Sequence, residues 1–291
     1  MSKKKMSGLI LALVFVSAVA GAEERPFVEI ISHLKKVDVS GIKLNNEVWE
    51  TVKPYRQVLQ KQFLEVPKPA DVGVEEVLVQ SITDGQYIAF RLTWKDATTD
   101  DGIKIMNFSD AAAIQFPVRK ESLPEFFMGE ETKPVHILYW KAWRSRDEKD
   151  GFQTVKTAYP NMTTDTYPLD YKIKGEGTEK TQAEKDTFIP GKAANNPLSF
   201  PTKEIIAELS STGPGTLASK KTKNTSGDVE WKNDEWRVLF RRPLIVDDPD
   251  SVQFKAGEKM PIAFAVWEGS RMEAGGRKAV SPAWAEVMVE K

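Results

Sequence analysis

The 291-residue chain contains no cysteine and only two histidines, His33 and His136. Without a thiolate it cannot form a disulfide, attach haem covalently through a Cys-x-x-Cys-His motif, bind an iron–sulfur cluster or build a cysteine zinc site. Two histidines also argue against a histidine triad or a three-histidine zinc centre. The sequence therefore excludes much metal and nucleophile chemistry, and the fold must be stabilised by a buried core.

Long apolar runs are also scarce. The run from Leu9 to Val16 follows three lysines and precedes small residues, which is the pattern of a secretory signal peptide. It is about half of the roughly 20 residues that a membrane-spanning helix needs. We expect residues 1–22 to be a signal peptide cleaved after Ala20 or Ala22, with an uncleaved anchor as the alternative. The mature chain is then periplasmic or otherwise exported, with no transmembrane segment.

An excess of basic residues is absent too. The chain has 41 basic and 42 acidic residues, and removing the three signal lysines leaves 38 against 42, a net charge of about −4. This balance argues against nucleic-acid binding. Residues 23–291 contain no repeat and no low-complexity linker, so we expect them to form a single domain.

Strand patterns dominate this domain. Apolar and polar residues alternate in short runs, and an Asp84-Gly85 turn joins two of these runs into a hairpin. Strands followed by strands favour a mainly β fold, an antiparallel β-sandwich with a few short helices. The expected strands include Glu75 to Ile82, Tyr87 to Trp94, Asp228 to Trp231, Glu235 to Phe240, Met260 to Trp267 and Trp284 to Val289.

Helical patterns are few. Val48 to Gln62, interrupted by Pro54, and Lys203 to Leu209 each place apolar residues on one helical face. Between Arg144 and Lys192 aliphatic residues thin out and polar residues accumulate, which predicts a long polar excursion.

The most informative segment runs from Asp110 to Trp143. It contains a strand-like run that Asp110 begins, a Phe127-Met128-Gly129 turn and a second apolar run from Pro134 to Ala142. A methionine in a glycine-containing turn between two apolar strands can present its thioether to a buried ligand.

These motifs resemble a family. An aspartate leading an "AxQFP" strand, an "MG" turn and a "YWKA" strand are similar to runs in the haem-binding gamma subunits of ethylbenzene dehydrogenase, dimethylsulfide dehydrogenase, selenate reductase, chlorate reductase and some nitrite oxidoreductases. Phe264 to Ser270 and Lys278 to Trp284 resemble the family's C-terminal "WxGS" and "VSxW" runs. Val39 to Trp49 resembles the opening of sandwiches related to family 9 carbohydrate-binding modules.

The resemblance implies one non-covalent b-type haem with methionine and lysine as axial ligands. Met128 is the methionine of the family's "MG" turn. The region corresponding to the family's lysine is Gly213 to Lys223, where three lysines compete. Because only a buried, neutral amine can bind iron, the lysine nearest the apolar Thr216-Leu217 end is preferred. The expected order is Lys220, then Lys221, then Lys223.

His136 is the rival ligand. On a strand it shares a face with Leu138 and Trp140, in a buried aromatic row. Without the resemblance, histidine would be the preferred haem ligand. With it, we interpret His136 as a hydrogen-bonded wall residue of the haem pocket.

The implied role is an exported electron-transfer subunit that catalyses no substrate reaction itself. Its implied partners are a molybdopterin-containing catalytic subunit and an iron–sulfur subunit, with a soluble cytochrome as external carrier. The alternatives are a sandwich without haem that is purely structural, or one that binds carbohydrate through exposed members of its eight tryptophans.

Overall fold

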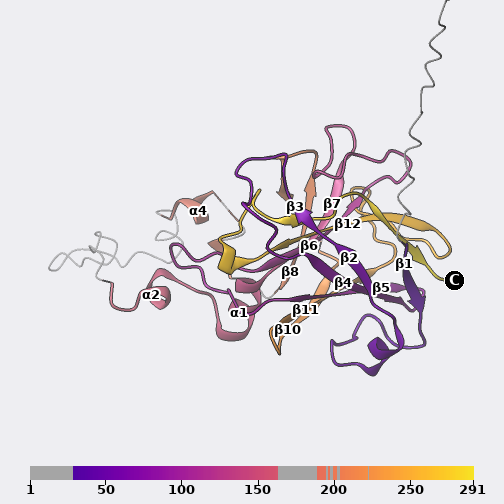
Figure 1. Cartoon of the computed structure of the whole chain (residues 1–291), viewed down its shortest axis with the longest axis horizontal. Coiled ribbons are helices and arrows are strands. Elements are labelled where there is room, and N and C mark those ends of the chain that lie inside the picture. The colour runs from indigo at the N-terminus through magenta and orange to yellow at the C-terminus, as the bar shows by residue number, and fades with distance from the viewer. Residues whose placement is uncertain (1–28, 163–188, 195, 197–198, 202–203, 222) are drawn as a thin grey trace, which may run out of the picture.

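Figure 1 shows the computed structural model, which describes residues 29–162, 189–194, 196, 199–201, 204–221 and 223–291. The predicted signal peptide, residues 1–22, lies outside these ranges, as do residues 163–188 of the predicted polar excursion. Within the described ranges, no helix combines the length and hydropathy required to cross a bilayer.

The described residues form fourteen hydrogen-bonded strands and a few short helices. The helical elements are η1 (Glu47–Thr51), α1 (Ala142–Asp150), α2 (Val155–Ala158), α4 (Pro190–Ala193) and η3 (Gly269–Arg271). The strands are β1 (Glu29–Leu34), β2 (Tyr55–Val58), β3 (Gln60–Lys61), β4 (Glu76–Thr83), β5 (Tyr87–Lys95), β6 (Ala111–Pro117), β7 (Val135–Lys141), β8 (Ile206–Ser211), β9 (Ala218–Ser219), β10 (Ser226–Trp231), β11 (Glu235–Pro243), β12 (Lys259–Trp267), β13 (Ala279–Val280) and β14 (Ala285–Val289).

The strands make two layers that share β12. Residues Lys259 to Ile262 of this strand pair with β14, and residues Ala263 to Trp267 pair with β6. The first layer runs β10-β11-β5-β4-β1-β14, and the second runs β6-β7-β8-β9. Most pairs are antiparallel, although β1 is parallel to both β4 and β14. The predicted mainly β sandwich is therefore confirmed.

The main core lies between the two layers, and the alternation in β5 explains why. Ile88, Phe90, Leu92 and Trp94 lie on one face of β5, are at most 2% exposed and belong to the main core cluster. Burying such side chains contributes about 1.5–3 kcal/mol each. On the opposite face, the segment of residues 37–52 forms a second cluster that includes Ala89. This part of the first layer is therefore covered on both faces.

The two helical predictions were wrong over most of their length. Lys203 to Leu209 contains the start of β8, because Ile206 and Leu209 pair with Trp140 and Ile137 of β7. Of the other segment only residues 48–51 are helical, as part of the 3-10 turn η1 that Asn46 caps, and the chain then continues as β2 and β3. In both segments, pairing with a neighbouring strand outweighs the helical pattern, which is a weak preference by itself.

The outer face of the second layer carries a third cluster of apolar residues. It includes residues of β6, β7 and β8, with Met128, Tyr139 and Trp284 packed against it. Helices α2 and α4 lie off to one side of the sheets (Figure 1). A cavity lies on this outer face.

Candidate functional site

A cavity of about 470 Å³ lies on the outer face of the second layer. Its floor is made by side chains that point outward from β6, β7 and β12, and several of them are alanines, which leave space above the sheet. The floor residues are Ala111, Ala113, Gln115, Ile137, Tyr139, Lys141, Ala263, Ala265 and Trp267. The cavity is therefore mostly apolar, with a small number of polar groups.

Loops make the walls of the cavity. They contribute the segment Phe126 to Met128, residues of the Pro214 to Leu217 turn, residues between Gln62 and Val66, and the segment Glu273 to Lys278 except Arg277. The segment from Asp110 to Trp143 and the Gly213 turn, which are distant in sequence, thus line one cavity.

The turn that carries Met128 is held in an uncommon conformation. Met128 has φ 76° and Gly129 has φ 89°, so two consecutive residues are left-handed. A Cβ atom on Gly129 would lie 2.8 Å from the carbonyl oxygen of Ser211, so only glycine fits there. The backbone N–H of Gly213 donates to the carbonyl of Met128 over 3.0 Å. These contacts tie the methionine turn to the loop after β8.

Lys278 lies opposite Met128. Its Nζ atom is 4.0 Å from the Met128 Sδ atom and 5.0 Å from the centre of the Trp267 ring. Among the described residues no carboxylate forms an ion pair with Lys278, and burial lowers the pKa of its amine to about 8. A lysine without a counter-charge, in a desolvated place, can be neutral near physiological pH.

A second lysine, Lys141, lies at the end of β7 on the same face as Ile137 and Tyr139. Burial, and then the charge of Arg144, lowers the pKa of Lys141, and no carboxylate of the described ranges forms an ion pair with it. Tyr139 packs edge-on against Trp267 at 5.6 Å, and burial raises its pKa. The cavity thus offers two amines and an aromatic pair.

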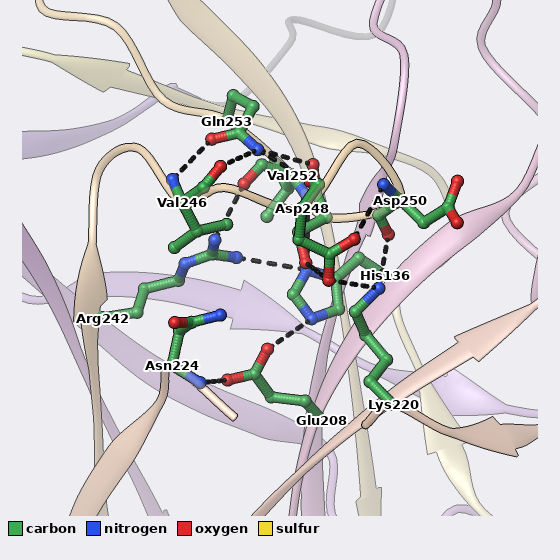
Figure 2. Close-up of polar contacts among 11 residues, drawn as sticks. His136, Glu208, Lys220, Asn224, Arg242, Val246, Asp248, Asp250, Val252 and Gln253 are labelled. Atoms are coloured by element: carbon green, nitrogen blue, oxygen red, sulfur yellow. Dashed lines mark hydrogen bonds and ion pairs between the residues drawn. The ribbon is translucent and has the colours of Figure 1, made fainter. Parts of the chain in front are cut away.

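The structure does not bring Lys220 and Met128 together. The Lys220 side chain is only 6% exposed, but its Nζ lies 3.0 Å from Asp248 Oδ2 and donates to the Asp250 carbonyl over 2.9 Å (Figure 2). Leu217 lines the cavity, and Lys220 follows it by three positions, so strand alternation turns Lys220 away. Lys220 was preferred as a ligand because its amine was expected to be buried. The amine is indeed buried, but in an ion pair with Asp248.

The other two lysines of that loop also lie outside the cavity lining. Lys221 is exposed, and Lys223 is exposed and pairs with Glu204. The loop therefore contributes a wall of the cavity through Pro214, Gly215 and Leu217, while its lysines have other surroundings.

His136 is fully buried on the inner face of the second layer. Its Nε2 lies 3.1 Å from Glu208 Oε2, while Nδ1 accepts from the Val252 N–H at 3.2 Å and lies 3.1 Å from Arg242 Nη1 (Figure 2). Burial lowers the pKa of His136, so the neutral ring donates from Nε2 and accepts at Nδ1. Both nitrogens are engaged. His136 is hydrogen-bonded as expected, but it lies between the layers and does not line the cavity.

Glu208 is the ionised partner in this network. Burial raises the pKa of its carboxyl, but the hydrogen bonds from His136 and the Asn224 N–H outweigh this effect, and the pKa falls to about 2. The buried Arg242 guanidinium supplies positive charge nearby. The network in Figure 2 joins β7, β8 and β11 to the loop after β11.

Sequence reasoning missed Lys278 although it begins the "KAVSPAW" motif. The alternation of side chains along that strand-like run could have indicated the position of Lys278. Ala279 is fully buried, whereas Lys278 and Val280 both line the cavity. Alternation alone places Lys278 with Val280, but it does not say that Met128 faces them.

The fold and the site define a β-sandwich with a cofactor-sized cavity on the outer face of one sheet. The family model described as "Ethylbenzene dehydrogenase" matches residues 46–279. The chain therefore belongs to the ethylbenzene dehydrogenase family.

Three curated relatives share between 22% and 26% of aligned residues with the chain. A protein of Haloferax mediterranei, provisionally named a respiratory nitrate reductase heme subunit, is 26% identical over 81% of this chain. The chlorate reductase subunit gamma of Ideonella dechloratans is 24% identical over 73%, and the dimethylsulfide dehydrogenase subunit gamma of Rhodovulum sulfidophilum is 22% identical over 72%. The matches span 64%, 64% and 59% of those relatives, respectively.

Among solved structures, a family 9 carbohydrate-binding module of Caldicellulosiruptor kristjanssonii in complex with glucose matches with a TM-score of 0.42. It is 8% identical, and the match covers 90% of this chain and 95% of the module.

Proposed function

We propose that this chain is an exported electron-transfer subunit that holds one non-covalent b-type haem between Met128 and Lys278. The observation that carries the proposal is the 4.0 Å contact between the Met128 sulfur and the Lys278 amine, two residues that both line the apolar cavity. Lys278 replaces Lys220 as the proposed second ligand, because Lys220 is paired with Asp248 elsewhere.

The residues present fit such a cofactor. The cavity volume of about 470 Å³ lies within the range of about 300–1,000 Å³ for small-molecule and cofactor sites. The Met128 sulfur and the Lys278 amine, 4.0 Å apart, are the two groups that would hold the haem iron.

Lys278 is suited to donate a lone pair. An ammonium group has no lone pair, so a ligating lysine has to lose its proton. Here burial lowers the pKa of Lys278 to about 8, and the Met128 thioether beside it adds no charge. A carboxylate in this position would hold the proton on the amine, and none of the described residues supplies one.

Lys141 is suited to a different part of the same cofactor. Haem carries two carboxylate side chains, and Lys141 is a cation at one end of the cavity floor without a carboxylate partner among the described residues. We assign it to binding one of these carboxylates. Arg144, whose charge acts on Lys141, adds to the positive potential there.

When bound, the haem supplies reversible one-electron chemistry, and two protein ligands leave its iron no open position for substrate. The chain itself holds the two ligands and excludes water with Tyr139 and Trp267. A methionine ligand raises the reduction potential. These roles are those of an electron carrier and include no catalytic step.

The names of the relatives support the assembly that we propose. They include a nitrate reductase heme subunit and the gamma subunits of chlorate reductase and dimethylsulfide dehydrogenase. We infer that this chain assembles with a molybdopterin catalytic subunit and an iron–sulfur subunit in the periplasm, and exchanges electrons with a soluble cytochrome. Residues 1–22 would direct its export.

Haem reconstitution of the full mature chain tests the ligand pair. We expect one haem per chain and a low-spin spectrum, which Met128→Leu and Lys278→Arg each change, because leucine has no donor atom and arginine stays protonated. Lys220→Met tests the rival ligand and should leave the spectrum of the bound haem unchanged. If the chain binds no haem, the proposed electron-transfer function is contradicted. If the haem spectrum responds to Lys220→Met but not to Lys278→Arg, only the assignment of Lys278 as the second ligand is contradicted.

A further inference from the structure

Three carboxylates are buried together away from the proposed ligand pair. Asp96 follows β5, Asp110 precedes β6 and Glu268 follows β12. They are 3%, 0% and 6% exposed, and each offers an oxygen within 4.8 Å of the others. None of the ion pairs found in the described residues involves any of the three. A buried charge costs several kcal/mol unless it is compensated, so this group requires an explanation.

The hydrogen bonds around Asp110 are those of an ionised carboxylate. Its Oδ1 accepts from the Gly269 N–H at 2.8 Å, and its Oδ2 accepts from the Asp100 N–H at 2.7 Å and from Trp236 Nε1 at 3.1 Å. Three donors on one carboxylate favour its charged form. Burial, followed by the charge of Asp96, acts in the opposite direction and raises the pKa of Asp110 to about 8. Either a shared proton or a bound cation would relieve this repulsion, and the unpaired oxygen of Asp96 distinguishes between them.

Asp96 provides an independent sign that something is bound here. Its Oδ1 accepts from the Thr98 N–H at 3.0 Å, but its fully buried Oδ2 has no hydrogen-bond partner. A buried oxygen without a partner costs about 1–3 kcal/mol, and more when it is charged. Both hydrogen bonds found for the Glu268 carboxylate, from the Ser270 N–H and Oγ, go to Oε1. Oxygens of two residues are thus available to a further ligand.

The oxygens of the three residues are close enough to bind one metal ion. Ca²⁺ binds oxygen at about 2.3–2.6 Å, so two oxygens on opposite sides of it lie up to about 5 Å apart, whereas Mg²⁺ requires about 2.0–2.1 Å. Oxygens within 4.8 Å of one another can all bind one Ca²⁺ ion. Three buried carboxylates also suit Ca²⁺ better than Mg²⁺, which usually keeps several waters and binds one or two carboxylates. Carboxylates that bind in monodentate or bidentate mode supply three to six of the six to eight oxygens that Ca²⁺ takes.

We propose that Asp96, Asp110 and Glu268 bind one calcium ion that joins the ends of β5, β6 and β12. The site goes beyond the proposed haem function and does not depend on it. It would nevertheless act on the cavity, because Ala111 and Trp267, the chain neighbours of Asp110 and Glu268, line the floor. Trp267 lies beneath Lys278 at 5.0 Å. The ion would therefore hold in place the strand ends that carry part of the cavity floor.

Calcium titration of the chelator-treated, haem-free full mature chain tests this site. We expect one Ca²⁺ per chain by calorimetry, a rise in Tm with Ca²⁺ and a smaller rise with equal Mg²⁺, since a ligand that binds only the folded state stabilises it. Asp96→Asn and Glu268→Gln should each weaken calcium binding by about tenfold or more, given that even outer-shell changes cost about 10–100-fold. Glu131→Gln, at an exposed position, is the matched control.

The sign of the variants' effect on Tm separates a calcium site from three acids that share protons. With chelator, Asp96→Asn should raise Tm because it removes repulsion, and with saturating Ca²⁺ it should lower Tm relative to the unsubstituted chain. An Asp96→Asn chain that is more stable in both conditions overturns the proposal. Equal Tm values of the unsubstituted chain with chelator and with Ca²⁺ overturn it too.

Terbium luminescence tests the same site without any variant that could fail to fold. Tb³⁺ occupies calcium sites and emits when a nearby tryptophan absorbs light, and the Trp236 indole donates directly to Asp110. We expect tryptophan-excited emission that one equivalent of Tb³⁺ saturates and that Ca²⁺ displaces. An absence of saturable emission, or emission that Ca²⁺ leaves unchanged, contradicts the assignment.

Discussion

The Lys278 amine lies 4.0 Å from the Met128 sulfur, although 150 positions separate the two residues in the chain. Met128 sits in a left-handed turn that Gly213 holds through a backbone hydrogen bond, and Lys278 directly precedes β13. No carboxylate of the described residues neutralises the lysine. A buried amine is therefore placed beside a thioether, which is a pair of donor atoms suited to a metal and of little use as an ion pair.

Gly129→Ala should displace the Met128 turn. The substitution forces a Cβ to within 2.8 Å of the Ser211 carbonyl at a residue with φ 89°. Strain at such a position costs about 1–3 kcal/mol. We expect a lower free energy of unfolding by denaturant and weaker haem binding.

Gly85→Ala is the matched control for that substitution. Gly85 has φ 88°, but a Cβ there meets nothing within 4 Å. Gly85→Ala should lower the free energy of unfolding through backbone strain but leave the haem affinity unchanged. Equal effects of the two alanines on haem binding would contradict the proposed role of the Gly129 contact.

Lys278→Leu should stabilise the haem-free chain near pH 7. Burial lowers the pKa of Lys278 to about 8 from an ordinary 10.5, so the unfolded chain holds the proton more tightly than the folded chain. At about 1.4 kcal/mol per pKa unit, the penalty is up to roughly 3 kcal/mol. It is fully present below about pH 8 and disappears as pH rises toward 10.5.

Denaturant unfolding between pH 7 and pH 10.5 measures this effect. The advantage of Lys278→Leu over the unsubstituted chain should shrink across the window, while exposed Lys221→Leu shows no such trend. An advantage that stays constant with pH would mean that the gain comes from added apolar contact alone.

Lys220→Met should have the opposite effect on stability. It removes the partner of Asp248, whose side chain is 13% exposed. Loss of one member of a buried pair costs about 3–5 kcal/mol. Asp248 keeps hydrogen bonds from the Ser251 Oγ and the Asp250 N–H, so we expect a smaller loss of about 2–3 kcal/mol, measured by denaturant unfolding. Lys221→Met is the control, and a Lys220→Met chain as stable as this control would contradict the importance of the ion pair.

Glu208→Gln should reduce the acid sensitivity of the fold. The folded-state pKa of Glu208, about 2, lies below its ordinary value of 4.5, so its contribution is present above pH 4.5 and is lost as pH falls toward 2. The contribution is roughly 3 kcal/mol. The unsubstituted chain should lose about this much more stability than the variant between pH 4.5 and 2, whereas exposed Glu131→Gln should follow the unsubstituted chain.

Lys141→Met should weaken haem binding without altering the axial ligands. Lys141 lies on the cavity floor with no described carboxylate partner, so removing its charge takes away an attraction for a haem carboxylate. A charged hydrogen bond contributes about 1.5–3 kcal/mol, which corresponds to a loss of affinity of roughly 10- to 150-fold. Haem titration measures the affinity. A changed low-spin spectrum would place Lys141 at the iron instead.

Much of the fold could be predicted because apolar and polar residues alternate along its strands. The apolar face of β5 and the Asp84-Gly85 turn are local patterns, and both lie where the sequence placed them. The start of β8 was mistaken for a helix because its partner, β7, lies more than 60 positions earlier. Short apolar runs fit both periods, and only the partner strand decides between them.

The candidate site, too, was predicted only in part from the sequence. From the sequence alone, the absence of cysteine excluded covalent haem and bound clusters, and the glycine beside Met128 marked a turn able to present a thioether. Only the tertiary structure decided which lysine faces that thioether. Lys220 and Lys278 are both shielded from water, but one pairs with Asp248 and the other has no described counter-charge. Local sequence determines which side chains can be buried, whereas the partner that each meets depends on how distant strands and loops pack.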